Sequence, residues 1–198
     1  MIYNFAGSDP GDSNYGYSVI NVKPLKGFKV SILELGMMTC RINNLTDRPA
    51  KPPKSKRRKR MVVLDYAPYP VQFRLFTDEW DEIIRYHGVK RVTSERFQAR
   101  GLRGKSIECV SIMNGIICSV ADAQYKVYEI ITPASWKNQV NRYFKLEDLY
   151  KKLSLTPHTV DSVFIGLHGA IKYFGIDWAD IDFEQVIDEL SQFEFVKR

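Results

Sequence analysis

Four side chains from three distant segments are of types that bind divalent metal ions. Asp9 follows a short apolar run and lies within Gly-Ser-Asp-Pro-Gly, Glu95 ends another apolar run, and His158 and Asp161 open a strongly periodic segment. Mg²⁺ prefers carboxylate oxygens, and two such ions can activate a water and stabilise the leaving oxygen in phosphodiester hydrolysis. The four residues therefore predict a nuclease-type metal centre, provided that the fold brings them together.

Each of these residues also has an ordinary structural interpretation. Asp9 suits a turn between Gly and Pro, Glu95 suits an exposed strand end between two arginines, and His158 suits the start of a helix. The spacing of His158 and Asp161 favours a site, because residues three apart lie on one helix face. Asp161 also borders an apolar stripe, and a buried carboxylate needs a cationic partner.

The elements that must position these residues follow from hydrophobic periodicity. Residues 2–8, 15–22 and 28–36 alternate as three consecutive antiparallel strands, and residues 89–97 and 126–132 read as a fourth and a fifth strand. Residues 61–64 are also strand-like. Helical spacing predicts helices over 70–87, 105–124, 145–153 and 157–174, the last with Thr156 as N-cap. Strands that alternate with helices imply parallel pairing, so the pattern predicts an α/β fold: a five-stranded mixed sheet of three antiparallel and two parallel strands, with helices on both faces.

Length and composition bound the class of protein. A chain of 198 residues with 44% hydrophobic content can bury one core, so one main domain is expected. No apolar run reaches the length of a membrane span, and the start lacks the layout of a secretion signal. The three cysteines, Cys40, Cys109 and Cys118, form no CxxC pair and suggest neither a zinc site nor a disulfide framework. We expect an intracellular, cytoplasmic protein, in the host cytoplasm if a phage encodes it.

The net charge of +6 comes from one segment. Seven of the 29 basic residues fall within residues 51–60, which leaves 22 against 23 acidic residues elsewhere. Prolines in the same stretch predict an extended, mobile loop over 49–60, and nucleic acid is the expected partner. A solvated surface loop and a nuclear-import-like signal are the alternatives. The cations are Lys51, Lys54, Lys56, Arg57, Arg58, Lys59 and Arg60.

Taken together, the motifs resemble those of the RuvC family of Holliday-junction resolvases, within the RNase H-like superfamily. The resemblance covers roughly residues 1–172 and follows the order of the family motifs. It rests on Gly7-Ser8-Asp9-Pro10-Gly11 with Tyr15-Gly16-Tyr17, on Ser94-Glu95, on Thr132-Pro133-Ala134-Ser135-Trp136-Lys137, and on His158-Thr159-Val160-Asp161. Two features depart from the family: position 158 is His where many members have Asp, and the basic segment is longer than expected.

The resemblance implies roles for individual residues. Asp9, Glu95 and Asp161 would bind Mg²⁺, for which Mn²⁺ would substitute, and His158 would be a ligand or a proton-transfer group. Lys137 would lie near the scissile phosphate. Phe97 would stack on an unpaired base at the branch, with a core position as the alternative, and basic residues of the following loop would hold the backbone. Those loop residues are Arg100, Arg103 and Lys105.

The resemblance also implies a homodimer that places two sites across a four-way DNA junction and makes paired nicks. Small residues in the segment 105–124 (Ser106, Ser111, Gly115 and Ser119) suit a dimer contact, with burial in the core as the alternative. Two other functions stay open: a less selective endonuclease that cuts flaps or three-way branches, and a DNA-structure-binding protein without catalysis.

The C-terminal part falls outside the resemblance. We expect a nuclease domain over residues 1–174 and an acidic helical extension over 175–198. Val186, Ile187 and Leu190 give that extension an apolar face, which favours a helix that caps the domain. The alternative is an acidic tail that competes with DNA for the basic loop.

Overall fold

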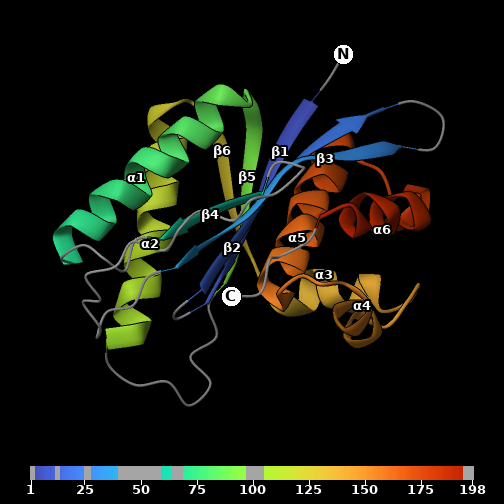
Figure 1. The fold of residues 1–198 in the computed structure, drawn as a ribbon. Coiled ribbons are helices and arrows are strands. Elements are labelled where there is room, and N and C mark those ends of the chain that lie inside the picture. The colour runs from blue at the N-terminus through green and yellow to red at the C-terminus, as the bar shows by residue number, and fades with distance from the viewer. Residues whose placement is uncertain are drawn as a thin grey trace.

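The fold is a mixed sheet with helices on both faces (Figure 1). The computed structural model describes residues 3–11, 14–24, 28–39, 59–63, 69–96 and 105–193. Its sheet has the order β4-β3-β2-β1-β5-β6, in which β1, β2 and β3 are antiparallel and the β1–β5, β5–β6 and β3–β4 pairs are parallel. The strands are β1 (Tyr3–Pro10), β2 (Asn14–Lys23), β3 (Lys29–Thr39), β4 (Lys59–Val63), β5 (Val89–Glu95) and β6 (Val127–Ile131).

The five predicted strands and their directions are confirmed, and the sheet carries β4 as a sixth strand. β4 pairs with β3 from Leu35↔Lys59 to Thr39↔Val63. The prediction that residues up to 60 belong to the basic loop is wrong for Lys59 and Arg60, which lie in β4. The reason is tertiary: the outer edge of β3 presents unpaired backbone groups, and this segment supplies partners for them.

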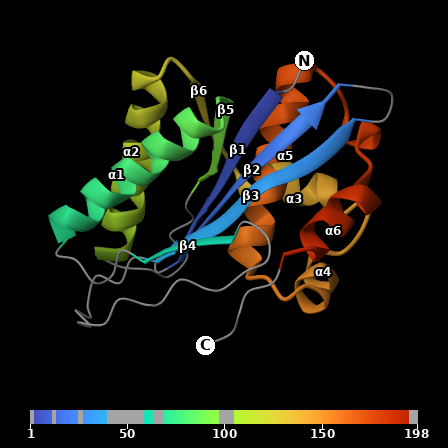
Figure 2. The same ribbon diagram turned by 45° about the horizontal axis from the view of Figure 1, so that its top comes forward.

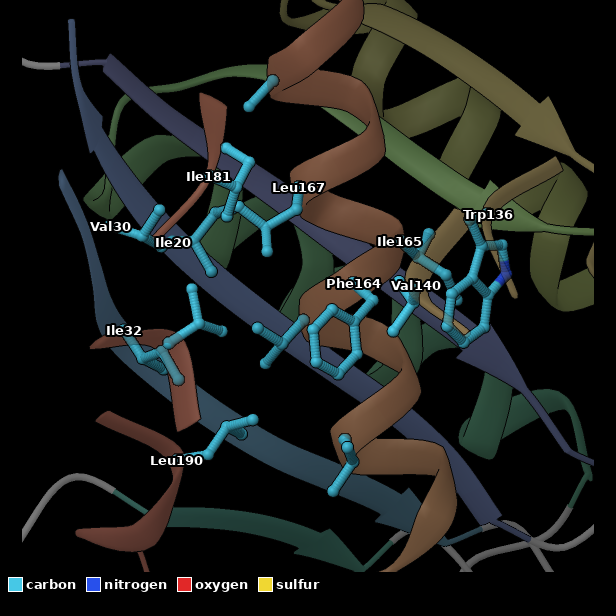
Figure 3. Packing of buried hydrophobic residues seen from close by; sticks show 14 of the residues in the cluster. Ile20, Val30, Ile32, Trp136, Val140, Phe164, Ile165, Leu167, Ile181 and Leu190 are labelled. Atoms are coloured by element: carbon cyan, nitrogen blue, oxygen red, sulfur yellow. The ribbon is translucent and has the colours of Figure 1, made fainter. Parts of the chain in front are cut away.

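The helices form one layer on each face of the sheet (Figures 1 and 2). α1 (Tyr69–Tyr86) and α2 (Lys105–Ala123) cover one face, whereas α5 (Pro157–Phe174) lies on the other with α3 (Pro133–Val140), α4 (Leu146–Lys152) and α6 (Phe183–Ser191). The sheet thus separates two apolar clusters, of which the one around α5 is the larger (Figure 3). In the part of the chain that the structure describes, no helix is both long and apolar enough to cross a membrane.

α5 lies very close to the sheet because β1 and β2 carry glycines where it crosses them. A Cβ at Gly7 would stand 1.8 Å from the carbonyl oxygen of Ser162, and a Cβ at Gly16 would stand 2.2 Å from that of His158. Thr156 caps the helix as predicted, since its side chain accepts a hydrogen bond from the Thr159 N–H. Gly7 and Gly16 therefore set the depth at which the first turns of α5 meet the strand ends.

The C-terminal helix α6 covers the part of the β3 edge that β4 does not reach. The Gln185 amide accepts from the Val30 N–H at 3.1 Å and donates to the Val30 carbonyl at 2.6 Å, and Glu189 Oε2 accepts from the Ile32 N–H at 3.1 Å. Val186 and Leu190 are fully buried in the cluster around α5. The predicted apolar face of this helix is thus packed against the sheet, and polar side chains beside it satisfy an edge strand.

Candidate metal centre

Parallel pairing of β1 with β5 places Asp9 and Glu95 side by side. The two strands are in register through Ser8↔Ser94, so the next residue of each strand carries the carboxylate. Side chains alternate between the faces of a strand, and Gly7 of β1 and Thr93 of β5 both meet α5. Asp9 and Glu95 therefore face α5 as well. Asp9 lies within β1, so its interpretation as a turn residue is wrong.

The first turns of α5 bring His158 and Asp161 to the same place. His158 Nδ1 lies 2.7 Å from Asp9 Oδ2, and Asp161 is only 4% exposed. The residues are three apart and share one face of the helix, as their spacing predicts. The charge of Asp9 is close enough to raise the pKa of both Glu95 and Asp161. The four predicted residues therefore converge at the carboxyl-terminal ends of β1 and β5, beside the first turns of α5.

Lys137 completes the group from α3, a helix that the sequence analysis does not predict. β6 ends at Ile131, opposite Glu95, and Pro133 then occupies the first turn of α3, where a missing N–H costs nothing. One turn later the Lys137 Nζ lies 2.9 Å from Asp161 Oδ2, with 35% of the side chain exposed. The predicted phosphate-binding lysine is therefore within the site, paired with one of its carboxylates.

The negative charges of the three carboxylates are only partly neutralised by the groups around them. Burial, and then the charge of Asp9, raise the pKa of Glu95 from 4.5 to about 7, while Lys137 and a hydrogen bond from Trp136 act in the opposite direction. Burial and the charge of Asp9 likewise raise the pKa of Asp161 from 3.8 to about 6, opposed by Lys137 and Tyr150. Such shifts mark a buried anionic site that an added cation would stabilise.

The same negative charges stabilise the protonated forms of the two basic side chains. The hydrogen bond to Asp9 raises the pKa of His158 above its usual range and outweighs the effect of burial. Burial acts to lower the pKa of Lys137, but the charges of Asp161, Glu95 and Asp9 outweigh it and raise that pKa. Among the residues that the structure describes, His158 and Lys137 thus supply positive charge to this cluster.

Two further side chains at the site were missed by the sequence analysis. The Trp136 indole N–H donates to Glu95 Oε2 at 2.7 Å, and the Tyr150 hydroxyl donates to Asp161 Oδ1. Trp136 stands in the quoted motif next to Lys137, and Tyr150 lies on the apolar stripe of α4, so the pattern alone marks both as core residues. Their polar ends are the available signal, because a buried Trp or Tyr needs a hydrogen-bond partner.

The strand ends are also held from the opposite face of the sheet. The Asn114 side chain on α2 accepts hydrogen bonds from the Tyr15 hydroxyl at 2.8 Å and the Ser94 hydroxyl at 2.9 Å. Ser94 in turn lies 3.5 Å from the Ser8 hydroxyl. Because Ser8 and Ser94 precede Asp9 and Glu95, this buried network fixes the two backbones that carry the carboxylates.

The donor set fits a divalent metal ion. Asp9, Glu95 and Asp161 offer carboxylate oxygens, which are the ligands that Mg²⁺ and Mn²⁺ prefer, and His158 adds a ring nitrogen, a softer ligand that suits Mg²⁺ poorly. Within the described ranges, no group of three or more His, Cys, Asp or Glu side chains is arranged to hold a metal ion. In this arrangement carboxylate oxygens of the site pair with His158, Lys137, Trp136 and Tyr150. Binding of a metal ion would therefore require Lys137 to release Asp161 Oδ2 or His158 to release Asp9 Oδ2.

The predicted DNA contacts fall almost wholly outside the described residues. This holds for Phe97, Arg100 and Arg103 and for residues 51–58 of the basic loop. Lys59 and Arg60 in β4 and Lys105 at the start of α2 are placed by their backbone alone. On α2, Ser111, Gly115 and Ser119 are exposed, so burial in the core is the wrong interpretation for these three.

The comparisons with known proteins give matches of structure. A scan against protein families finds no match, and a search of curated proteins finds none either. Two structures of Thermus thermophilus RuvC match with a TM-score of 0.60, one in complex with a Holliday junction substrate at 16% identity and one of the protein at 17%, and in both cases 88% of this chain and 97% of that chain are covered. The yeast mitochondrial Holliday junction resolvase matches over 94% of this chain and 72% of its own, at 15% identity and a TM-score of 0.42. Together with the strand order and directions, the RuvC likeness shows that this chain has the RNase H-like fold of the RuvC resolvases.

Proposed function

We propose that this protein is a metal-dependent endonuclease that resolves four-way DNA junctions by paired nicking. The observation that carries the proposal is the convergence of Asp9, Glu95, Asp161, His158 and Lys137, from four separate elements, at one edge of the sheet. A protein that only bound DNA would gain nothing from three crowded carboxylates facing a polyanion. The Thermus thermophilus RuvC structure with a Holliday junction substrate adds support from the same fold.

The residues divide the work of phosphodiester hydrolysis among them. Asp9, Glu95 and Asp161 would hold divalent metal ions, which supply Lewis-acid activation of water and charge neutralisation on the phosphate. His158 Nδ1 is hydrogen-bonded to Asp9 Oδ2 at 2.7 Å, where the protonated ring could give up a proton and the neutral ring could become a ligand. If a metal ion takes the place of Lys137 on Asp161, the partly exposed Lys137 ammonium can pair with a phosphate oxygen instead.

The proposal extends to the assembly and the location of the protein. Two sites are needed to nick both strands of a junction, so we propose a homodimer with the exposed small residues of α2 at its contact. The basic segment 51–60 would reach a DNA arm without reading sequence. Because its proposed substrate is DNA, we also propose that the protein acts inside the cell, in the cytoplasm.

The decisive experiment compares Asp9→Asn with the unchanged protein on labelled four-way junctions in Mg²⁺. We expect junction binding to persist and cleavage to fall by at least about 100-fold, because a positioned metal contributes several kcal/mol to the transition state. Asp122→Asn, on the exposed side of α2, is the matched control and should cleave normally. Unchanged cleavage by the Asp9 variant would remove this site from the mechanism, and absence of cleavage by the unchanged protein would favour a binding function.

A panel of substrates then tests selectivity. Four-way junctions, three-way branches, flaps and linear duplexes should be cut in that order of preference if the protein is a junction resolvase. Equal rates on flaps and four-way junctions would favour the less selective endonuclease of the same fold.

A further inference from the structure

The α3–α4 segment, residues 133–152, contributes two aromatic hydrogen-bond donors to the site in addition to Lys137. Trp136 on α3 donates to Glu95, and Tyr150 on α4 donates to Asp161. Both donors are electrically neutral, whereas Lys137 and His158, which pair with Asp161 and Asp9, are cationic when protonated. The carboxylates are thus contacted by two different kinds of group.

Trp136 is held rigidly by packing. Its side chain is fully buried, and its ring stacks on Phe164 of α5 at 6.2 Å between centroids with an interplanar angle of 10°. Figure 3 shows the ring at the edge of the packed cluster, with its nitrogen turned away from the other side chains. Because the indole has a single N–H, that donor points to one place, Glu95 Oε2 at 2.7 Å.

Tyr150 plays the corresponding part for Asp161. Its ring packs against the cluster around α5, and its hydroxyl donates to Asp161 Oδ1 while Lys137 pairs with Oδ2 at 2.9 Å. Each oxygen of Asp161 therefore has its own partner, one neutral and one cationic. If a metal ion displaces Lys137, the hydroxyl still fixes the rotation of the carboxylate plane.

The difference between the two kinds of donor decides what each can do. A cationic partner competes with an incoming metal ion for the same negative charge, whereas a neutral donor orients the carboxylate and leaves most of its charge available. Donors anchored in a packed core also hold the ligand near one geometry before the ion arrives, which lowers the entropic cost of binding.

We propose that Trp136 and Tyr150 are positioning residues that hold Glu95 and Asp161 in the orientation required for divalent-cation binding. The role rests on the proposed function, since it concerns the same site. The α3–α4 segment would thus serve the site in two ways: Lys137 would pair with a phosphate oxygen, and the two aromatic side chains would orient the carboxylates of Glu95 and Asp161.

The test measures binding of Mn²⁺ alone by isothermal titration calorimetry to the full chain. Trp136→Phe and Tyr150→Phe each remove one donor and keep an aromatic ring in place. Loss of an outer hydrogen bond of this kind typically weakens metal affinity by about 10- to 100-fold, and we expect an effect in that range for each variant. The matched controls are Trp178→Phe, a nearly buried indole stacked on Phe183, and Tyr143→Phe, a half-exposed phenol in the same segment.

Two further measurements separate positioning from a merely structural role. The melting temperature without metal should change no more in the site variants than in the controls, and the Mn²⁺ concentration for half-maximal junction cleavage should rise while the rate at saturating Mn²⁺ stays within a few-fold of the unchanged protein. Metal affinity that is unaltered in both site variants, or lowered equally in the controls, would overturn the proposal. If circular dichroism shows that Trp136→Phe is misfolded, Tyr150→Phe alone decides.

A parallel titration of Asp9→Asn distinguishes this inference from the proposed function. Mn²⁺ binding that is lost in Asp9→Asn but kept in both aromatic variants rejects the positioning role and leaves the metal centre intact. No Mn²⁺ binding by the unchanged protein, or equal binding by Asp9→Asn, rejects the metal centre and the positioning role with it.

Discussion

Replacing Glu95 by Gln should make the protein more stable at alkaline pH, although Glu95 belongs to the proposed catalytic site. The carboxylate is partly buried beside the negative charge of Asp9, and these surroundings raise its pKa from 4.5 to about 7. Gln has nearly the same shape and its amide oxygen can still accept from the Trp136 N–H. The substitution therefore removes the charge and keeps the hydrogen bond.

The sign of the effect follows from proton binding. The folded protein holds the Glu95 proton more tightly than the unfolded chain does, so folding takes up a proton between pH 4.5 and about 7. The free energy of unfolding therefore falls as pH rises through this window, and the full destabilisation is present above it. The amide of a glutamine does not titrate, so the Glu95→Gln variant escapes this loss.

The magnitude is large enough to measure. At about 1.36 kcal/mol for each pKa unit, a rise from 4.5 to about 7 corresponds to about 3 kcal/mol. Water reaches part of the side chain and screens the repulsion, so we expect about 2 kcal/mol at about pH 8, or roughly 4–8 °C in melting temperature for a chain of this length.

The assay is urea unfolding of both proteins in EDTA at about pH 5 and about pH 8. The two should be similar at the lower pH, and the Glu95→Gln variant should be the more stable at the higher one, while it loses junction cleavage. The control is Glu129→Gln on β6, a carboxylate that has Arg91 at 3.5 Å and Lys172 as cationic partners and should gain no stability. A Glu95→Gln variant with no gain at about pH 8, or with the same gain at both pH values, would refute the electrostatic reasoning.

Three further predictions concern other parts of the molecule. Mn²⁺ affinity should fall as pH is lowered from about 8 to about 5.5, because Glu95 and Asp161 take up protons with pKa values of about 7 and about 6; calorimetry that gives a flat profile would contradict this. Gly16→Ala should lower the free energy of unfolding by about 1–3 kcal/mol and abolish cleavage, since its Cβ would lie 2.2 Å from a backbone oxygen of α5; Asp122→Ala, at an exposed position of α2 outside the proposed dimer contact, is the control and should be neutral or stabilising in urea melts. Replacing residues 51–58 by a neutral linker, which spares β4 and removes five cations, should weaken junction binding and reduce the steepness of its salt dependence by up to about 4.5 in log–log slope, measured by fluorescence anisotropy; an unaltered slope would exclude this segment as a DNA contact.

Local features of the sequence determined the elements and the candidate ligands. Alternation in β1 and β5 placed Asp9 and Glu95 at strand ends, and the periodic stripe of α5 with its Thr156 cap placed His158 and Asp161 in the first turns. These predictions succeed because the periodicity of a strand or a helix depends on residues that are close in sequence. The parallel pairing that joins the strand ends followed from the order of strands and helices.

Tertiary structure alone decided which distant groups complete the site and the sheet. Trp136 and Tyr150 are core aromatics by pattern, and only the packing of α3 and α4 against α5 turns their polar ends to Glu95 and Asp161. In the same way, β4 and the side chains of α6 satisfy the β3 edge across long sequence separations. Periodicity tells which face of an element is buried, but which donor meets which acceptor across that face depends on the relative placement of elements, and in this protein the glycines of β1 and β2 set that placement for α5.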